Sequence, residues 1–469
     1  MSEKLFRKEV YFLMKLPISI RLRNKITPTQ IIILGFLLAI LAGTFLLKLP
    51  ISHNGMQKIS FLDALFTSTS AVCVTGLIIK DTATTWSGFG QGVILFLVQI
   101  GGLGIMFLFS IFALITKKQL NLKERITMQE AINSPSLSET VNMFIQILIV
   151  TLIIELIGAL LLLKEFYPIW GIDGIWKSIF LSVSAFCNAG FDILGTKNYQ
   201  FQSIVSLANN PSVLITLSLL IIIGGLGFVV WKDIWENKFN FKRYTLHSKI
   251  VLLSTAILLA LGTVLFFVFE ANNKNSIADM PFGLKLTNSF FNSVSPRTAG
   301  FTSIGTKNLK ESTNFLTILL MIIGGAPGST AGGIKITTFS ILVLTAIFFM
   351  RGHEDVQIMK NNIPHQIIFK SMCIFLLALL LISIGTFVLL IDNDDLSMLS
   401  AFFEATSAFS TTGIATGITA SLNVVSKLTL LVIMFFGRIG PLTMVLAFSQ
   451  KQLIKKSTYK YSDGKISVG

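Results

Sequence analysis

FLDALFTSTSAVCVTGL (61–77) is the first of four stretches with one pattern, an apolar helix-like run that ends in small polar residues and a glycine. The others are IWKSIFLSVSAFCNAGF (175–191), LKLTNSFFNSVSPRTAGF (284–301) and MLSAFFEATSAFSTTGI (398–414). The closing glycines are Gly76, Gly190, Gly300 and Gly413, which lie 114, 110 and 113 residues apart. Four copies at such regular spacing predict a fourfold internal repeat.

The composition excludes a soluble globular protein. Of 469 residues 52% are apolar and 13% charged, about half the roughly 25% charged residues of soluble domains. Mean hydropathy is +0.75, which also argues against disorder. Three cysteines in or beside apolar stretches (Cys73, Cys187 and Cys373) cannot supply a disulfide framework.

Eight apolar runs approach the roughly 20 residues that cross a bilayer. They lie near 28–48, 89–116, 141–163, 212–231, 249–269, 315–350, 367–391 and 428–448. The first lacks a small-residue cleavage site, so we expect it to remain as a span rather than act as a signal peptide. Segments on one side of these spans carry 23 Lys and Arg, and those on the other carry 12. The positive-inside rule therefore predicts cytoplasmic termini, and accounts for much of the net charge of +15 without nucleic acid.

The four quoted stretches lie between paired spans, on the outer side. Irregular backbone is tolerated at membrane depth only inside protein or along a water-filled cavity, and glycine permits the positive φ that can turn carbonyl oxygens inward toward a cation. The sequence therefore predicts an all-α integral membrane protein of four parallel repeats, each a span, a re-entrant pore helix, a filter loop and a span, around a central pore. The short helices are expected from near Phe61, Ile175, Leu284 and Leu399.

The boundaries follow from this pattern. The predicted repeats are 28–116, 141–231, 247–350 and 367–448, between a basic leader (1–27) and a basic tail (449–469). The predicted filter, which binds a cation through backbone carbonyls, comprises Val72, Cys73, Val74, Thr75, Gly76, Phe186, Cys187, Asn188, Ala189, Gly190, Arg297, Thr298, Ala299, Gly300, Ser410, Thr411, Thr412 and Gly413.

The sixth apolar run is too long for one straight span. Its 36 residues would make a helix of about 54 Å against a core of about 30 Å, and its middle, GGAPGSTAGGIK (324–335), breaks a helix. We expect an intramembrane loop that closes the pore, the alternative being a static kink. The predicted gate comprises Gly324, Gly325, Ala326, Pro327, Gly328, Ser329, Thr330, Ala331, Gly332, Gly333, Lys335 and Arg438, the last either an electrostatic barrier below the filter or a snorkelling side chain.

Other charges at membrane depth have predicted partners. Asp63 is expected to serve the N-terminus of the first short helix. Glu404 is expected to pair with Arg297 behind the filter, the alternative being that both are hydrated. Asp192 either draws cations toward the mouth or is an ordinary surface carboxylate. Glu155 is expected to hydrogen-bond to a neighbouring helix.

The chain offers no constellation for an enzyme. Its four histidines have no metal-site spacing, and no nucleophile and base occur together at depth. The GGLG segments at 101–104 and 224–227 lie inside spans and predict close helix packing rather than a phosphate loop. We therefore predict no enzyme activity and no bound cofactor.

These motifs resemble those of the Trk/Ktr/HKT potassium transporters, and among them the KtrB-type membrane subunit. The resemblance spans about residues 28–450 and rests on VCVTG, FCNAG, SPRTAG, FSTTG, both GGLG segments, GGAPGSTAGGIK and GRIGPLT (437–443). One glycine per filter goes with potassium rather than sodium in that family. TrkH-type relatives carry two further N-terminal spans, for which the 27-residue leader leaves no room.

The resemblance implies a bacterial, multi-pass inner- or plasma-membrane protein that conducts K+ inward, with sodium dependence left open and a gating loop at 324–335. It also implies a homodimer on a cytosolic ring of nucleotide-binding RCK subunits of the KtrA type, for which 117–140, 232–249 and 449–469 are candidate docking segments. The alternatives are a TrkH-type subunit, a membrane-embedded enzyme, and a sodium-motive or structural subunit that does not itself conduct.

Overall fold

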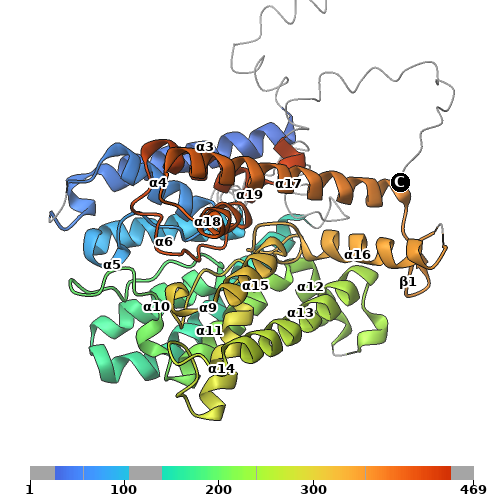
Figure 1. Cartoon of the computed structure of the whole chain (residues 1–469), viewed down its shortest axis with the longest axis horizontal. Coiled ribbons are helices and arrows are strands. Elements are labelled where there is room, and N and C mark those ends of the chain that lie inside the picture. The colour runs from blue at the N-terminus through green and yellow to red at the C-terminus, as the bar shows by residue number, and fades with distance from the viewer. Residues whose placement is uncertain (1–26, 56–57, 105–139, 239, 354, 445–469) are drawn as a thin grey trace, which may run out of the picture.

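The computed structural model of the chain describes residues 27–55, 58–104, 140–238, 240–353 and 355–444. Apart from one short hairpin, β1 (Gln357–Ile358) and β2 (Asn361–Asn362), its regular elements are helices. Four helical repeats surround a common centre, and in Figure 1 the blue first repeat lies beside the red fourth one. The expectation of an all-α membrane protein built from four repeats is confirmed.

Each repeat begins with a long apolar helix. These are α3 (Pro28–Lys48), α9 (Thr140–Trp170), α13 (Leu246–Glu270) and α17 (His365–Asp392). In the described part of the chain, these four helices are long and apolar enough to cross a membrane. Large apolar side chains remain exposed on them, such as Leu38, Leu156 and Leu376, as expected of a surface that faces lipid.

A shorter pore helix follows in each repeat, close to the predicted positions. These are α4 (Phe61–Val72), α10 (Asp173–Phe186), α14 (Phe282–Val294) and α18 (Met398–Ser410). Asp63 accepts a hydrogen bond from Ser60 N at 2.9 Å and completes a capping box at the start of α4. The capping role predicted for Asp63 is confirmed.

A serine fixes the pore helix to the long helix in three repeats. Ser68 Oγ donates to Ile40 O at 2.7 Å, Ser182 Oγ to Glu155 O at 2.6 Å, and Ser293 Oγ to Leu259 O at 2.9 Å. The glycine three residues after each acceptor makes the close approach possible, because a Cβ there would collide with the same serine. These glycines are Gly43, Gly158 and Gly262.

The second helix of each repeat closes the ring. These helices are α6 (Gly88–Leu103), α11 (Pro211–Leu226), α15 (Glu311–Ile322) and α19 (Val424–Ile439). Helix α6 packs against α10, α11 against α14, α15 against α18, and α19 against α4. Each second helix therefore contacts the pore helix of the next repeat, and the fourth repeat returns to the first.

The second helices are shorter than the predicted spans. Helices α6, α11 and α19 are each followed directly by a glycine, Gly104, Gly227 or Gly440, with φ of 83°, 90° and 95°. At Gly227 the chain bends by 94° into α12 (Phe228–Asn237), so residues 212–231 do not form one straight helix. The length of an apolar run predicts a membrane span, but it does not show which glycine within the run adopts a positive φ. The sequence therefore did not predict this bend.

The remaining described helices are short, except for α16. They are α5 (Thr82–Thr85), α16 (Ile336–Met350) and the 3-10 turns η1 (Pro50–Ser52), η2 (Val205–Leu207), η3 (Phe241–Arg243) and η4 (Thr306–Asn308). The predicted leader, the loop at 117–140 and the tail lie outside the described residues, apart from Thr27 and Thr140.

Candidate functional site

The four closing glycines meet around one axis. Their φ angles are 84° at Gly76, 68° at Gly190, 87° at Gly300 and 88° at Gly413. A Cβ on any of them would lie closer than 3.0 Å to a backbone oxygen of the adjoining repeat. In order, the facing oxygens belong to Ala189, Ala299, Thr412 and Thr75. The contacts run from the first repeat through the fourth and back, so backbone alone forms a closed ring.

The residue two positions before each glycine has a left-handed backbone conformation, with a positive φ. These residues are Val74, Asn188, Thr298 and Thr411, with φ of 57°, 57°, 71° and 51°. Such a conformation costs about 1–3 kcal/mol in a non-glycine residue and persists only where the surroundings impose it. Three of the four are β-branched, for which a positive φ is a genuine outlier. Its recurrence in all four loops indicates one shared, imposed geometry.

In each repeat, one backbone hydrogen bond joins the loop to the end of its pore helix. Thr75 N donates to Ser70 O at 2.7 Å, Ala189 N to Ser184 O at 2.8 Å, Ala299 N to Ser295 O at 2.9 Å and Thr412 N to Ser407 O at 2.9 Å. The serine lies six residues before the glycine in three loops and five in the third. The third loop therefore has one residue fewer between its serine and its glycine than the other three loops.

All four glycines line one cavity of about 710 Å³. Asp192, Lys307 and Thr416 are among the residues on its walls. Asp192 is 9% exposed, and its Oδ1 accepts a hydrogen bond from Leu194 N at 3.1 Å. The alternative of an ordinary surface carboxylate is therefore wrong for Asp192.

The other predicted filter residues are buried around this ring. Val72, Cys73, Val74, Thr75, Phe186, Cys187, Asn188, Ala189, Thr298, Ala299, Ser410, Thr411 and Thr412 are at most 1% exposed. Cys187 Sγ lies 3.5 Å from Gln99 Oε1, and Glu155 accepts from Gln99 Nε2 at 3.0 Å. The prediction that Glu155 bonds to a neighbouring helix, here α6, is confirmed.

The predicted pair of Glu404 and Arg297 is wrong. Arg297 Nη2 donates instead to Thr255 Oγ1 of α13 at 3.3 Å. Glu404 accepts from Thr416 N at 2.9 Å and from Thr419 Oγ1 at 2.9 Å. Both side chains are buried, at 7% and 0% exposure, so neither faces bulk solvent. The opposite charges suggested the pair, whereas the hydrogen-bond partners are a hydroxyl group for Arg297 and a backbone amide and hydroxyl groups for Glu404.

Between α15 and α16 the chain forms the predicted intramembrane loop. Gly324 N donates to Ile334 O at 2.8 Å and Ile336 N to Gly325 O at 3.0 Å, which closes the base of the loop. The loop also binds the second repeat, because Ala326 N donates to Gly225 O at 2.9 Å and Phe228 N to Gly328 O at 2.8 Å. The bend at Gly227 therefore places α12 against this loop.

The loop reaches two opposite filter loops. Thr330 Oγ1 donates to Phe186 O at 3.1 Å and lies 3.3 Å from the side-chain amide of Asn188. On the other side, a Cβ on Gly332 would collide with Thr411 Oγ1. Asn188 and Thr411 are the left-handed residues of the second and fourth loops. The intramembrane loop therefore bridges these loops at the pore-helix side of the glycine ring.

Arg438 ties the loop to the first repeat. Its guanidinium donates to Thr330 O, to Gly101 O and, at 3.2 Å, to Gly102 O. The side chain points into protein, so the snorkelling alternative is wrong. Ser329 and Lys335 bond within the loop, to Ala326 O and Ala331 O, each at 2.7 Å.

Sequence reasoning missed some residues that hold the outer segments. Asp81 accepts from Phe201 N at 2.8 Å and from Thr84 N at 2.9 Å, so it ties the outer segment of the second repeat to the first. The Asp-x-x-Thr spacing at 81–84 predicts the local cap, but nothing in the sequence indicates the distant Phe201.

Comparison with known proteins agrees with this architecture. Residues 8–456 match the family described as "TrkH: Cation transport protein". The chain is 38% identical to Ktr system potassium uptake protein B of Bacillus subtilis (strain 168), over 95% of this chain and 97% of that one. It is also 38% identical to potassium/sodium uptake protein NtpJ of Enterococcus hirae, over 96% and 99%.

A solved structure shares the fold. The potassium transporter TrkH from Vibrio parahaemolyticus superposes with a TM-score of 0.70 at 18% identity, over 91% of this chain and 86% of that one. The family resemblance predicted from the motifs is confirmed, and the family is one of transporters rather than enzymes. The chain belongs to the TrkH family of cation transport proteins.

Proposed function

We propose that this chain is the potassium-translocating membrane subunit of a bacterial Ktr-type uptake system, which conducts K+ inward through the four-loop filter. The closed ring of Gly76, Gly190, Gly300 and Gly413 carries the proposal. Backbone oxygens of all four repeats meet there, and such oxygens can replace the water shell of a dehydrated cation. The pore helices end at the same ring, and their partially negative C-termini favour a cation.

The intramembrane loop 324–335 is the proposed gate. Three ties support this role: Thr330 to the second filter loop, Gly332 against the fourth, and Arg438 to the loop and α6. A positive guanidinium on the pore-helix side of the ring also opposes passage of a cation. Movement of the loop away from Asn188 and Thr411 opens the path.

The proposed partners rest on the name of one relative and on the family resemblance. The Bacillus subtilis relative is named a Ktr system potassium uptake protein, which supports a cytosolic KtrA-type RCK ring as partner. A homodimer in the bacterial inner or plasma membrane, with both termini in the cytoplasm, completes the proposal and rests on the family resemblance and on the distribution of Lys and Arg. The Enterococcus hirae relative is named a potassium/sodium uptake protein, so Na+ enters the proposal as a second cation to be tested.

Rubidium or potassium uptake in a host that lacks its own potassium uptake systems tests the proposal. The proposed function predicts that this chain, expressed with a KtrA-type partner, restores uptake with a preference for K+ over Na+. A structural or sodium-motive subunit would give no potassium uptake by this chain.

A further inference from the structure

The fourth filter loop is held differently from the second and third. Ser184 Oγ donates to Phe191 O at 2.7 Å, and Ser295 Oγ donates to Phe301 O at 2.5 Å. In the fourth loop the matching Ser407 Oγ instead accepts from Gly413 N at 3.1 Å. The serine therefore does not hold the fourth loop in the way that it holds the other two.

Glu404 supplies a different attachment. It lies three residues before Ser407, and its Oε1 accepts from Thr416 N at 2.9 Å and Thr416 Oγ1 at 3.1 Å. Its Oε2 accepts from Thr419 Oγ1 at 2.9 Å. Thr416 and Thr419 both line the outer cavity. Glu404 therefore holds, through these hydrogen bonds, the segment that leads from Gly413 into the cavity wall.

The third repeat has a weaker version of the same contact. Asn292 lies three residues before Ser295, and its Nδ2 donates to Ser303 Oγ at 3.0 Å. Ser303 and Thr416 both lie three residues after their filter glycine. At the place of Glu404 the first two repeats have Thr67 and Leu181. The recurrence in two repeats indicates an attachment point built into the fold.

The environment of Glu404 favours a rigid role. The side chain is 0% exposed, and among the described residues no Lys, Arg or His nitrogen lies within 4.0 Å of its carboxylate. Three donors satisfy its oxygens instead, and hydrogen bonds to a carboxylate are stronger than those between neutral groups. Removal of the carboxylate would leave these buried donors without their acceptor.

We propose that Glu404 is the positioning residue of the fourth filter loop and that it sets the preference for K+ over the smaller Na+. The inference rests on the proposed function. Three loops on the same ring cannot compensate for one that moves, because each glycine contacts the next repeat. A loosened fourth loop can contract around Na+, so discrimination falls while the path stays open.

Competition by Na+ against rubidium uptake tests the proposal, with full-length chain and partner in a host deficient in potassium uptake. In Glu404→Gln and in Thr419→Val we expect Na+ to compete about tenfold better, which corresponds to about 1.4 kcal/mol, with a smaller change in maximal rate. In the double variant the two effects on Na+ competition should not add, because both substitutions remove the same hydrogen bond between Glu404 and Thr419.

Glu270→Gln is the matched control. Glu270 is also 0% exposed and accepts from Lys310 N at 3.0 Å and Ser276 Oγ at 2.5 Å, at the end of α13. It should lower the amount of folded protein without changing Na+ competition. Wild-type competition in folded Glu404→Gln would overturn the inference, and if that variant does not fold, wild-type competition in Thr419→Val would do so. Lack of rubidium uptake by the wild type would instead contradict the proposed function.

Discussion

At the scale of single residues, the site depends on backbone conformations that only glycine adopts easily. A side chain at Gly190 would need a φ of 68° and would place Cβ 2.8 Å from Ala299 O. We expect Gly190→Ser to reduce the preference for K+ over Na+ by about tenfold, or about 1.4 kcal/mol, as measured by ion competition. Gly283→Ser in α14 meets nothing within 4 Å and should behave like the wild type. Unchanged preference in serine variants of all four glycines would contradict the filter assignment.

The sequence predicted these glycines because four copies in register are a strong signal. It predicted the wrong partner for Glu404, since one buried carboxylate and one buried guanidinium suggest a pair whatever their positions. The structure places Arg297 against Thr255 and Glu404 against Thr416 and Thr419. Side-chain direction behind a loop depends on packing that no local pattern encodes.

At the scale of elements, the pore helices depend on close contact with the long helices. A Cβ at Gly158 would lie 2.5 Å from Ser182 Oγ and 2.8 Å from Leu220 Cδ1. Overpacking of this kind costs about 1–3 kcal/mol, so we expect Gly158→Ala to lower the thermal stability of the purified protein. Gly92→Ala, which meets no atom within 4 Å, is the control. Equal melting temperatures for both variants would contradict this packing.

The proposed gate depends on the contacts of Arg438 with the intramembrane loop and with α6. Arg438→Gln removes the charged donors to Thr330 O and Gly101 O. The loop should then leave the ring more often, and rubidium flux without the cytosolic partner should rise several-fold. Arg351→Gln, at an exposed position after α16, should leave the flux at the wild-type level. A flux in Arg438→Gln that stays low and fully dependent on the partner would contradict the role of Arg438.

The sequence located this loop from its glycine content but not the bends elsewhere. GGLG at 101–104 and 224–227 predicted close packing, and Gly101 and Gly224 indeed lie against Val72 O and Phe186 O. The same motifs also end α6 and α11, at Gly104 and Gly227. A single glycine with a positive φ ends a helix and changes the direction of the chain. Hydropathy does not show which glycine adopts this conformation.

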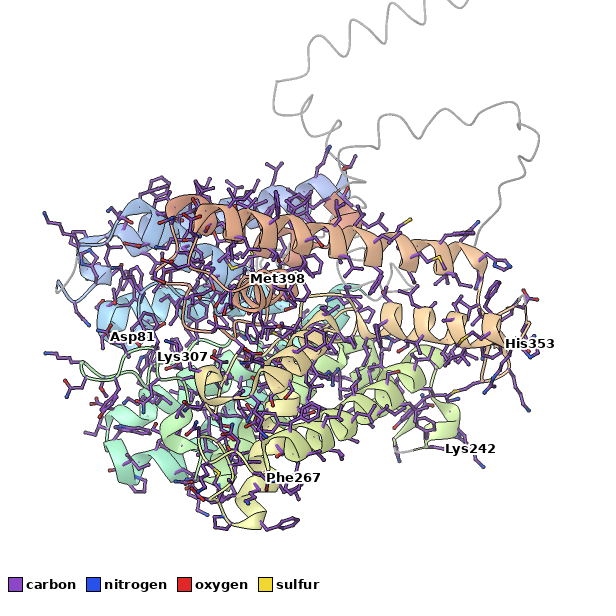
Figure 2. The ribbon with its side chains drawn as sticks, in the orientation of Figure 1. Asp81, Lys242, Phe267, Lys307, His353 and Met398 are labelled. Atoms are coloured by element: carbon purple, nitrogen blue, oxygen red, sulfur yellow. The ribbon has the colours of Figure 1, made fainter. Side chains whose placement is uncertain are left out.

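At the scale of the whole molecule, four repeats close into a ring whose two ends face opposite sides of the membrane. Figure 2 places Asp81 and Lys307 toward one end and Lys242 and His353 at the other. In a Cys373→Ser background, Lys197→Cys should react with a membrane-impermeant thiol reagent added to intact cells, whereas His353→Cys should react only after permeabilisation. Both positions are exposed. The reverse pattern would overturn the proposed orientation.

We propose a potassium-selective path that runs through the glycine ring and is closed by the intramembrane loop. Rubidium uptake into proteoliposomes that contain only this chain, wild type or lacking residues 326–331, tests it most directly. We predict low uptake by the wild type and high uptake by the deletion variant, inhibited by external K+ far more strongly than by Na+. Equal uptake by both proteins would contradict closure of the path by the loop, and equal inhibition by the two cations would contradict its selectivity for K+.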